Sequence, residues 1–347
     1  MFRVENISKN MGEFFLKNVS LDVALGEYLM ILGPTGAGKT ILLETIAGIY
    51  PPDEGKVYLN DRNITGLPPR KRNIGMVYQD FMLFPHLNVE ENIKYGMRSK
   101  KCSKVEVSQK VNKLAELLSI SHLLKRHPVT LSGGEKQRIS IARALVMEPE
   151  ILLLDEPLSA LDTETRAKLR KELRRIHALT RTTMIHVTHS FDEAFLLGSR
   201  MAIMNNGEIV QTGEPGEVFR KPNCRFVAEF LGVTNVFQGE AVIDDGDPCV
   251  KVNGLKIRSA SAGSGQVYAS VRPEDILVSF APIDSSARNS FQGEIKDISD
   301  AGIVLKITVD AGIPFVAAIT RRSFLDMGLN QGGKVFLTFK ATDVHVF

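Results

Sequence analysis

A run of glycines near the N-terminus ends in a lysine and a threonine, at a spacing that suits phosphate binding. The residues are Gly33, Pro34, Thr35, Gly36, Ala37, Gly38, Lys39 and Thr40, which fit the pattern GxxxxGK[ST]. Glycines let the backbone curl so that successive N–H groups surround phosphates, while Lys39 reaches the terminal phosphates and the Thr40 hydroxyl holds Mg²⁺. The run follows the apolar residues 28–32 and opens a helical stretch. It therefore predicts a P-loop, which kinases, GTPases and many ATPases share.

A second glycine pair begins another helical stretch. Ser132 precedes Gly133, Gly134 and Glu135, and Ser132 is suited to cap a helix whose first turn exposes N–H groups. Together with the P-loop, residues 131–138 resemble the signature of the ATP-binding-cassette ATPases, in the order that this family has. The resemblance implies that the signature of one subunit closes over ATP held by the P-loop of another.

An acidic pair follows the apolar strand-like run 151–154. Asp155 and Glu156 stand where ligands gather in doubly wound sheets, at the carboxyl end of a strand, and the segment resembles the family's Walker B strand. The resemblance implies that Asp155 holds Mg²⁺ through water. It also implies that Glu156 orients and deprotonates the attacking water.

Further site residues follow from the same resemblance. Gln79 matches the family's Q-loop glutamine, which contacts Mg²⁺ and links the nucleotide to a transmembrane partner, and the apolar residues 81–85 after it are expected to line a docking groove. His189 matches the switch histidine at the γ-phosphate, whereas His186 is expected to be a packed structural residue. Asp162 matches the D-loop, which crosses the dimer interface.

The adenine-stacking position departs from the family's pattern. The family places an aromatic residue just before a Gly-Glu-like turn near the N-terminus, whereas Met11 precedes Gly12 and Glu13 in this sequence. Either Met11 packs on the base through its polarizable thioether, or Phe14 takes its place.

The sequence pattern of the 347-residue chain changes part-way along. In residues 1–232, short apolar runs alternate with amphipathic helical stretches, which predicts an α/β ATPase domain with a largely parallel sheet and, by the resemblance, a helical subdomain. In residues 233–347, Val- and Ile-rich runs broken by Gly, Asp and Ser predict a smaller all-β domain, an OB-like or MOP-type barrel. Within it, residues 235–278 and 289–346 share matched blocks, which indicates a duplicated unit around one core.

Small polar residues and two cations in the second domain suggest anion binding. The residues are Ser286, Ala287, Arg288, Asn289, Lys340 and Thr342. Free N–H groups with Arg288 and Lys340 can form a nest that neutralises a tetrahedral dianion. The segment resembles the SARN motif of the oxyanion-binding domain of molybdate and tungstate importer ATPases, although Asp343 stands where that family has a small polar residue. The resemblance implies molybdate or tungstate as cargo and as a regulatory ligand.

Composition restricts the possible partners. The 43 basic and 40 acidic residues leave a net charge of +3, and groups such as Arg70, Lys71 and Arg72 are expected to be solvated surface rather than a nucleic-acid stripe. The longest apolar runs fall short of the ~18 residues that a membrane span needs. The 3 cysteines lie far apart without metal spacing, so we expect a chain of the reducing cytosol without disulfides or structural zinc.

One P-loop and one signature in the chain imply a homodimer with two ATP sites. The resemblance adds two transmembrane permease subunits, an extracytoplasmic oxyanion-binding protein that acts indirectly, and a peripheral position on the cytoplasmic side of the cell membrane. Other cargoes stay open: sulfate, ferric iron, sugar or polyamine. A soluble cassette ATPase acting on nucleic acid usually carries two cassettes in tandem, and the intact Lys39, Asp155, Glu156 and His189 argue against a mere oxyanion sensor.

Overall fold

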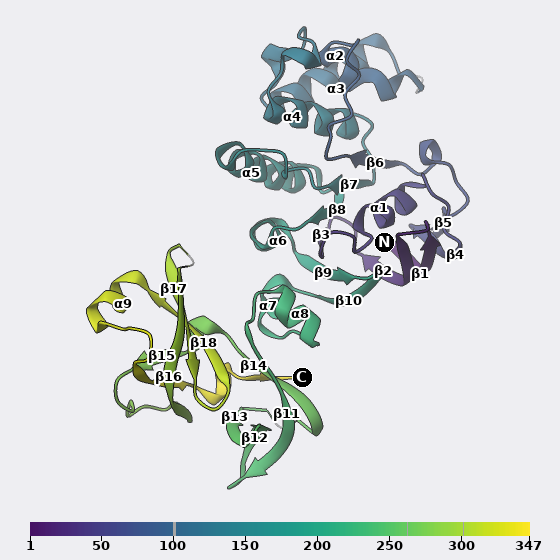
Figure 1. Ribbon diagram of the computed structural model, residues 1–347. Coiled ribbons are helices and arrows are strands. Elements are labelled where there is room, and N and C mark those ends of the chain that lie inside the picture. The colour runs from purple at the N-terminus through teal and green to yellow at the C-terminus, as the bar shows by residue number, and fades with distance from the viewer. Residues whose placement is uncertain (100–101, 262, 301) are drawn as a thin grey trace. The chain divides into compact units, whose positions relative to one another are not determined.

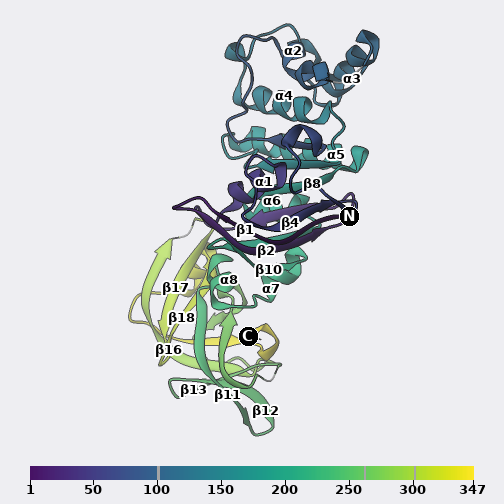
Figure 2. The same ribbon diagram turned by 90° about the vertical axis from the view of Figure 1, so that its right-hand side faces the viewer.

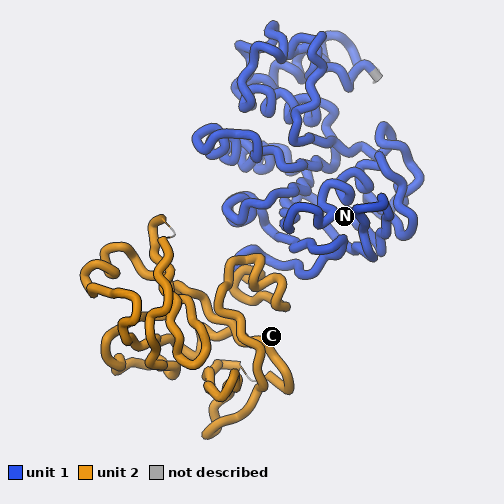
Figure 3. Tube along the Cα trace, viewed as in Figure 1, with its two compact units in different colours: residues 1–216 blue, residues 217–347 orange. Residues whose placement is uncertain are grey.

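The computed structural model describes residues 1–99, 102–261, 263–300 and 302–347. The chain folds as two compact units, Met1–Gly216 and Glu217–Phe347 (Figure 3). Each unit has a hydrophobic core of its own. None of the helices in these ranges is both long and apolar enough to cross a membrane.

A six-stranded sheet forms the centre of the first unit. Its strand order is β10-β9-β3-β8-β7-β6, and all neighbours are parallel except β10 with β9. The strands are β3 (Tyr28–Leu32), β6 (Ile74–Val77), β7 (Ile151–Asp155), β8 (Thr183–Thr188), β9 (Arg200–Asn205) and β10 (Glu208–Gly213). Every residue of β3, β7 and β8 is buried, because helices cover both faces of a parallel sheet. The predicted α/β architecture is confirmed.

A second sheet of the first unit is antiparallel, in the order β2-β1-β4-β5. Its strands are β1 (Phe2–Asn10), β2 (Phe15–Val23), β4 (Glu54–Leu59) and β5 (Arg62–Asn63). Helix α1 (Lys39–Ala47) buries Leu42, Leu43 and Ile46 in one core with residues of both sheets, and Figure 2 shows β1, β2 and β4 side by side next to it. The P-loop that precedes α1 is thus anchored at both ends by core elements.

The remaining helices of the first unit include a group of three at one end, at the top of Figure 1. These are α2 (Val89–Lys94), α3 (Lys104–Leu117) and α4 (Gly133–Leu145), followed along the chain by α5 (Thr163–Thr180) and α6 (Phe191–Leu197). Helices α2, α3 and α4 each begin with a capping box, in which Asn88, Ser103 and Ser132 exchange hydrogen bonds with a glutamate three residues on.

One basic residue contradicts the expectation of a solvated surface. Arg70 and Lys71 are exposed, but Arg72 is only 2% exposed. Its guanidinium donates to the carbonyls of Thr45 (3.0 Å) and Ile46 (2.8 Å) at the end of α1, and to those of Leu67 (2.8 Å) and Thr65 (2.6 Å). Arg72 therefore supplies donors to the last carbonyls of α1, of which Thr45 O also accepts from Gly48 N at 3.1 Å.

The second unit is built from two antiparallel five-stranded sheets, as the predicted all-β domain requires. Their orders are β13-β12-β11-β14-β20 and β15-β19-β16-β17-β18. The strands are β11 (Asn235–Asp244), β12 (Asp247–Val252), β13 (Leu255–Arg258), β14 (Gly265–Val271), β15 (Leu277–Ser279), β16 (Asn289–Asp300), β17 (Val304–Asp310), β18 (Pro314–Thr320), β19 (Lys334–Phe339) and β20 (His345–Val346). The short helices are α7 (Pro215–Arg220), which begins at the end of the first unit, α8 (Arg225–Phe230) and α9 (Arg321–Met327).

The two matched sequence segments exchange strands in this unit. β15, from the first segment, pairs with β19 of the second, and β20, from the second, pairs with β14 of the first. Each segment opens with a buried asparagine whose amide holds a backbone of the other sheet: Asn235 binds the N–H and carbonyl of Val316, and Asn289 those of Arg258. The Asn289 side chain is therefore a structural cross-link.

Candidate nucleotide-binding site

The P-loop connects β3 to α1 and has the shape of a phosphate cradle. Gly36 and Gly38 adopt left-handed backbone angles (φ 84° and 95°), and a Cβ at Gly33 would overlap the carbonyl oxygen of Met204. The Lys39 ammonium donates to the carbonyls of Gly33 and Pro34, both at 2.9 Å. Burial lowers the pKa of Lys39, while nearby Glu156 and Asp155 raise it. The loop thus presents a cation and backbone N–H groups at the start of a helix, which favours anion binding.

Oxygen ligands suited to Mg²⁺ lie beside this cradle. The Thr40 hydroxyl donates to Asp155 Oδ1 at 3.2 Å, and burial raises the pKa of Asp155 whereas this hydrogen bond lowers it. Hydroxyl and carboxylate oxygens are the donors that Mg²⁺ prefers. A third acid, Glu44, lies one helical turn after Thr40, and its pKa is raised by burial and by Asp155. Sequence reasoning did not include Glu44, although its i+4 spacing from Thr40 places both on one helix face.

The structure brings Glu156 and His189 together. Their side chains approach to 3.2 Å, between His189 Nδ1 and Glu156 Oε2, at the carboxyl ends of β7 and β8. Glu156 has a left-handed backbone (φ 42°), held because its N–H donates to Val187 O while Ser159 donates to its carbonyl through both N and Oγ. Strain of this kind persists where surrounding bonds enforce it, often at functional sites.

Gln79 follows β6 at the same edge of the sheet, because β6 pairs in parallel register with β7. Its side chain is exposed and has no hydrogen bond to Thr40 or Asp155 among the described residues. The next residues are fastened to α4: Arg143 donates to the carbonyls of Phe81 and Met82, at 3.1 Å and 2.6 Å. Both carbonyls belong to left-handed residues (φ 60° and 49°). The Q-loop segment is therefore a strained turn held by the signature helix.

The signature residues pack against the start of α5. Ser132 caps α4 in a box with Glu135, and a Cβ at Gly134 would come within 2.5 Å of Thr165 Cγ2. Asp162 caps α5 by accepting from Thr165 N at 3.0 Å. Among the described residues, the neighbours of the signature glycines are thus Thr165 of α5, Leu161 of the loop before α5 and Phe81 of the Q-loop segment, and not residues of the P-loop of the same chain.

Comparisons with known proteins show to which protein family this site belongs. The ABC transporter family model matches residues 16–159, and the TOBE domain model matches residues 285–346. The chain is 46% identical over 348 residues to the molybdate/tungstate import ATP-binding protein WtpC of Pyrococcus horikoshii, with 100% of both chains covered. The chain belongs to the ATP-binding-cassette transporter ATPases. Relatives of this ATPase that are named for other cargoes include the Fe(3+) ions import ATP-binding protein FbpC of Fusobacterium nucleatum, 35% identical over 99% of this chain and 92% of that one.

Solved structures of cassettes agree with the fold of the ABC ATPase. A dimeric post-hydrolysis cassette bound to ADP and Pi superposes with a TM-score of 0.56 at 31% identity, covering 62% of this chain and 99% of that one. A cassette in its ADP conformation gives a TM-score of 0.58 at 27% identity, covering 66% and 97%. Binding and hydrolysis of ATP are thus the activity of this ABC ATPase.

The turn before β2 places Phe14 beside the P-loop of the ABC ATPase. Met11 N donates to Phe14 O at 2.8 Å, and both side chains are partly exposed, at 39% and 46%. Phe14 Cε1 lies 3.9 Å from the position that a Cβ on Gly36 would take. Of the two alternatives for the adenine-stacking residue, this geometry favours Phe14.

Replacing Phe14 with Ala should raise the KM for ATP about 3- to 10-fold with little change in kcat, because an aromatic stacking contact contributes about 0.5–1.5 kcal/mol. Met11→Ala should change the KM less than about twofold. Steady-state ATPase assays of both variants, with Phe14→Tyr as the conservative control, make the comparison. A larger effect at Met11 would assign the base to the thioether instead.

Two of the predicted oxyanion residues of the ABC ATPase, Arg288 and Lys340, lie at one end of two neighbouring strands. Asn289 pairs with Phe339, so Arg288 and Lys340, both exposed, flank the same end of β16 and β19. The Asp343 carboxylate faces its own turn, where it accepts from Lys340 N (3.3 Å) and Thr342 Oγ1 (3.2 Å). The Asp343 carboxylate is thus hydrogen-bonded within its own turn.

Thr342 and Asp343 also line a pocket of about 520 Å³ within the second unit, together with Arg220, Arg272 and His345. The segment 286–289 does not line this pocket. Arg288 and Lys340 therefore lie at the same end of β16 and β19, whereas Thr342 lines a separate pocket.

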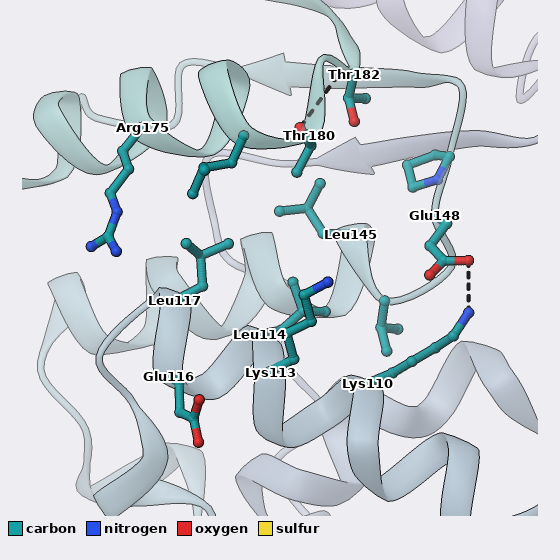
Figure 4. A pocket seen from close by; sticks show the side chains of 13 residues that line it. Lys110, Lys113, Leu114, Glu116, Leu117, Leu145, Glu148, Arg175, Thr180 and Thr182 are labelled. Carbon is teal, nitrogen blue, oxygen red and sulfur yellow. Dashed lines mark hydrogen bonds and ion pairs between the residues drawn. The ribbon is translucent and has the colours of Figure 1, made fainter.

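Another pocket of the ABC ATPase, of about 680 Å³, lies between α3, the end of α4 and the end of α5 (Figure 4). The ion pair of Lys110 with Glu148, at 2.6 Å, closes one side of it. Pro149 and Thr182, which precede β7 and β8, line it, so it opens at the sheet edge opposite the P-loop. None of the predicted site residues lines this pocket.

Proposed function

We propose that this chain is the energy-coupling subunit of an importer that moves molybdate or tungstate into the cell, and that it works as a homodimer on two transmembrane permease subunits. The observation that carries the proposal is the full-length identity of 46% to a molybdate/tungstate import ATP-binding protein. The position of Arg288 and Lys340 at the same strand end supports it, because two cations suit a tetrahedral dianion.

The proposed dimer follows from the separation of the two ATP-binding halves. The signature glycines pack against α5, so the P-loop of one copy requires the signature of another to enclose its nucleotide. A cassette relative has been solved as a dimer bound to ADP and Pi, which is consistent with this arrangement.

In the proposed site, each residue acts from the position described above. The P-loop N–H groups and Lys39 bind the phosphates, and Thr40, Asp155 and Gln79 are the groups that would hold Mg²⁺. Mg²⁺ supplies positive charge that offsets the negative charge developing during phosphoryl transfer. Glu156 accepts the proton of the attacking water, and His189, at 3.2 Å from it, orients that carboxylate toward the γ-phosphate.

The proposed permease contact is the segment 81–85. Met82 and Pro85 are exposed, and the strained turn formed by Phe81 and Met82 is held by Arg143 of the signature helix. A displacement of this segment by the permease would therefore be transmitted to α4, and through α4 to the signature residues. We expect the chain to lie at the cytoplasmic side of the membrane, while an extracytoplasmic oxyanion-binding protein delivers cargo to the permease.

Uptake by whole cells tests the cargo. Cells whose copy of this chain carries Lys39→Ala should take up labelled molybdate and tungstate at least about tenfold more slowly, because the lysine that binds the phosphates is lost. Uptake of ferric iron and putrescine should stay unchanged. Normal molybdate uptake with lost iron or putrescine uptake would overturn the assignment and favour a cargo named for the other relatives.

The same assay with Arg288→Ala tests oxyanion feedback. Wild-type uptake should slow once cells are preloaded with molybdate, whereas the variant should continue at its initial rate because the nest has lost a cation. Purified Arg288→Ala should keep its basal ATPase. Equal slowing in both strains would reject the regulatory role of this segment without affecting the cargo assignment.

A further inference from the structure

A cluster of buried polar side chains lies beneath the loop that carries His189. Tyr28 of β3, His186 of β8 and Glu193 of α6 are 1%, 0% and 3% exposed. The Tyr28 hydroxyl lies 3.0 Å from His186 Nδ1, and His186 Nε2 lies 3.5 Å from Glu193 Oε2. Burying a carboxyl group costs free energy unless it is hydrogen-bonded, so the partners of Glu193 show what it does.

Glu193 holds the residues on both sides of His189. The Thr188 hydroxyl donates to Glu193 Oε2 at 2.7 Å, and the Ser190 N–H donates to that same hydroxyl at 3.1 Å. Glu193 N in turn donates to Ser190 Oγ at 3.4 Å. The loop of residues 188–190 is thus held by the Glu193 carboxyl group. Thr188 binds this group directly, and Ser190 is linked to it through the Thr188 hydroxyl.

His186 does not compete for this carboxyl as a charged partner. Burial lowers the pKa of His186 to about 3, so its imidazole is neutral near pH 7. Burial also raises the pKa of Glu193, while the Thr188 hydrogen bond and the nearby Arg166 and Arg170 lower it. In the described part of the chain, Thr188 Oγ1 is therefore the side-chain donor that satisfies Glu193.

The His189 side chain has little packing of its own. It is 65% exposed, and its contact with Glu156 at 3.2 Å joins it to a residue that is itself on a loop. The direction of the ring must therefore come from the backbone of residues 188–190.

We propose that Glu193 is a positioning residue for ATP hydrolysis, which acts through Thr188 to hold the loop so that His189 meets Glu156 and the γ-phosphate. This inference rests on the role proposed above for His189.

Steady-state ATPase kinetics of the full-length chain test it. Thr188→Val and Glu193→Ala should each lower kcat about tenfold or more and leave the KM for ATP within about twofold, because the P-loop is untouched. Glu193→Gln should stay within about threefold of the wild-type kcat, since its amide oxygen still accepts from Thr188. The double variant Thr188→Val with Glu193→Ala should be no slower than the slower single variant, because both break one connection.

Tyr28→Phe is the matched control, since it breaks the far end of the same buried cluster without touching the loop. It should lower the melting temperature and leave kcat unchanged. If Glu193→Ala loses no more kcat than Tyr28→Phe at a similar loss of melting temperature, the positioning role is overturned. Should Glu193→Ala fail to fold, the milder Thr188→Val decides on the same criterion.

His189→Ala separates the two levels of the inference. A low kcat in His189→Ala with a normal kcat in Glu193→Ala and Thr188→Val would overturn the role of Glu193 alone. A normal kcat in His189→Ala would overturn the role of His189 itself, whatever the Glu193 variants show.

Discussion

Glu156→Gln should lower the kcat of ATP hydrolysis by a factor of about 10² to 10⁴, the contribution expected of a general base. The substitution keeps the shape of the side chain, and the backbone bonds to Val187 and Ser159 that hold the residue in its left-handed conformation are unaffected. The amide cannot accept the proton of the attacking water. ATP should therefore bind normally and accumulate unhydrolysed.

Two measurements on this variant are informative together. Turnover is followed by phosphate release, and size-exclusion chromatography in the presence of ATP and Mg²⁺ should show a stable dimer that the wild type forms only transiently. Glu164→Gln, an exposed glutamate at the start of α5 that pairs with Lys168, is the matched control and should behave as wild type. Undiminished turnover in Glu156→Gln would reject this residue as the base.

Arg72→Met should destabilise the first unit by about 3–5 kcal/mol, which is large for a single substitution. The guanidinium donates to four carbonyls at a site that is 2% exposed, and methionine fills the volume without supplying a single donor. The Ile46 carbonyl at the end of α1 would lose the donor that Arg72 supplies, and the Thr45 carbonyl would keep only its hydrogen bond from Gly48 N. Arg72→Lys should recover only part of the loss, since one ammonium cannot match the planar fork of donors.

Differential scanning calorimetry of the full chain measures this effect. The unfolding transition of the first unit should shift to lower temperature in Arg72→Met, while Lys71→Met, its exposed neighbour, should leave the transition in place. Equal transitions in the two variants would show that the carbonyls find other partners.

Much of the nucleotide site could be predicted from the sequence because its residues directly follow buried strands. Gly33, Asp155 and His189 each come at or after the end of an apolar run, and parallel strands place these ends at one edge. The meeting of Glu156 with His189 then needs only that β7 and β8 be neighbours, which the structure shows.

Other features of the structure depend on contacts between residues that no local sequence pattern predicts. Arg72 stands beside two exposed basic residues, and only the position of the end of α1 buries it. Asn289 belongs to an anion-binding pattern in the sequence, yet its amide binds the backbone of Arg258, 31 residues away in the chain. Glu193 has a spacing from Ser190 that is typical of a helix start, but the pattern does not reveal that its carboxyl is buried against Thr188.

The exchange of β15 and β20 between the two sheets links the folding of the two halves of the second unit. Because each sheet contains a strand contributed by the other half, we expect that two fragments produced by a break in the exposed residues 280–286 would fold only in each other's presence. A ligand held at the Arg288 end of β16 would accordingly stabilise the whole unit against unfolding, and not one sheet of it.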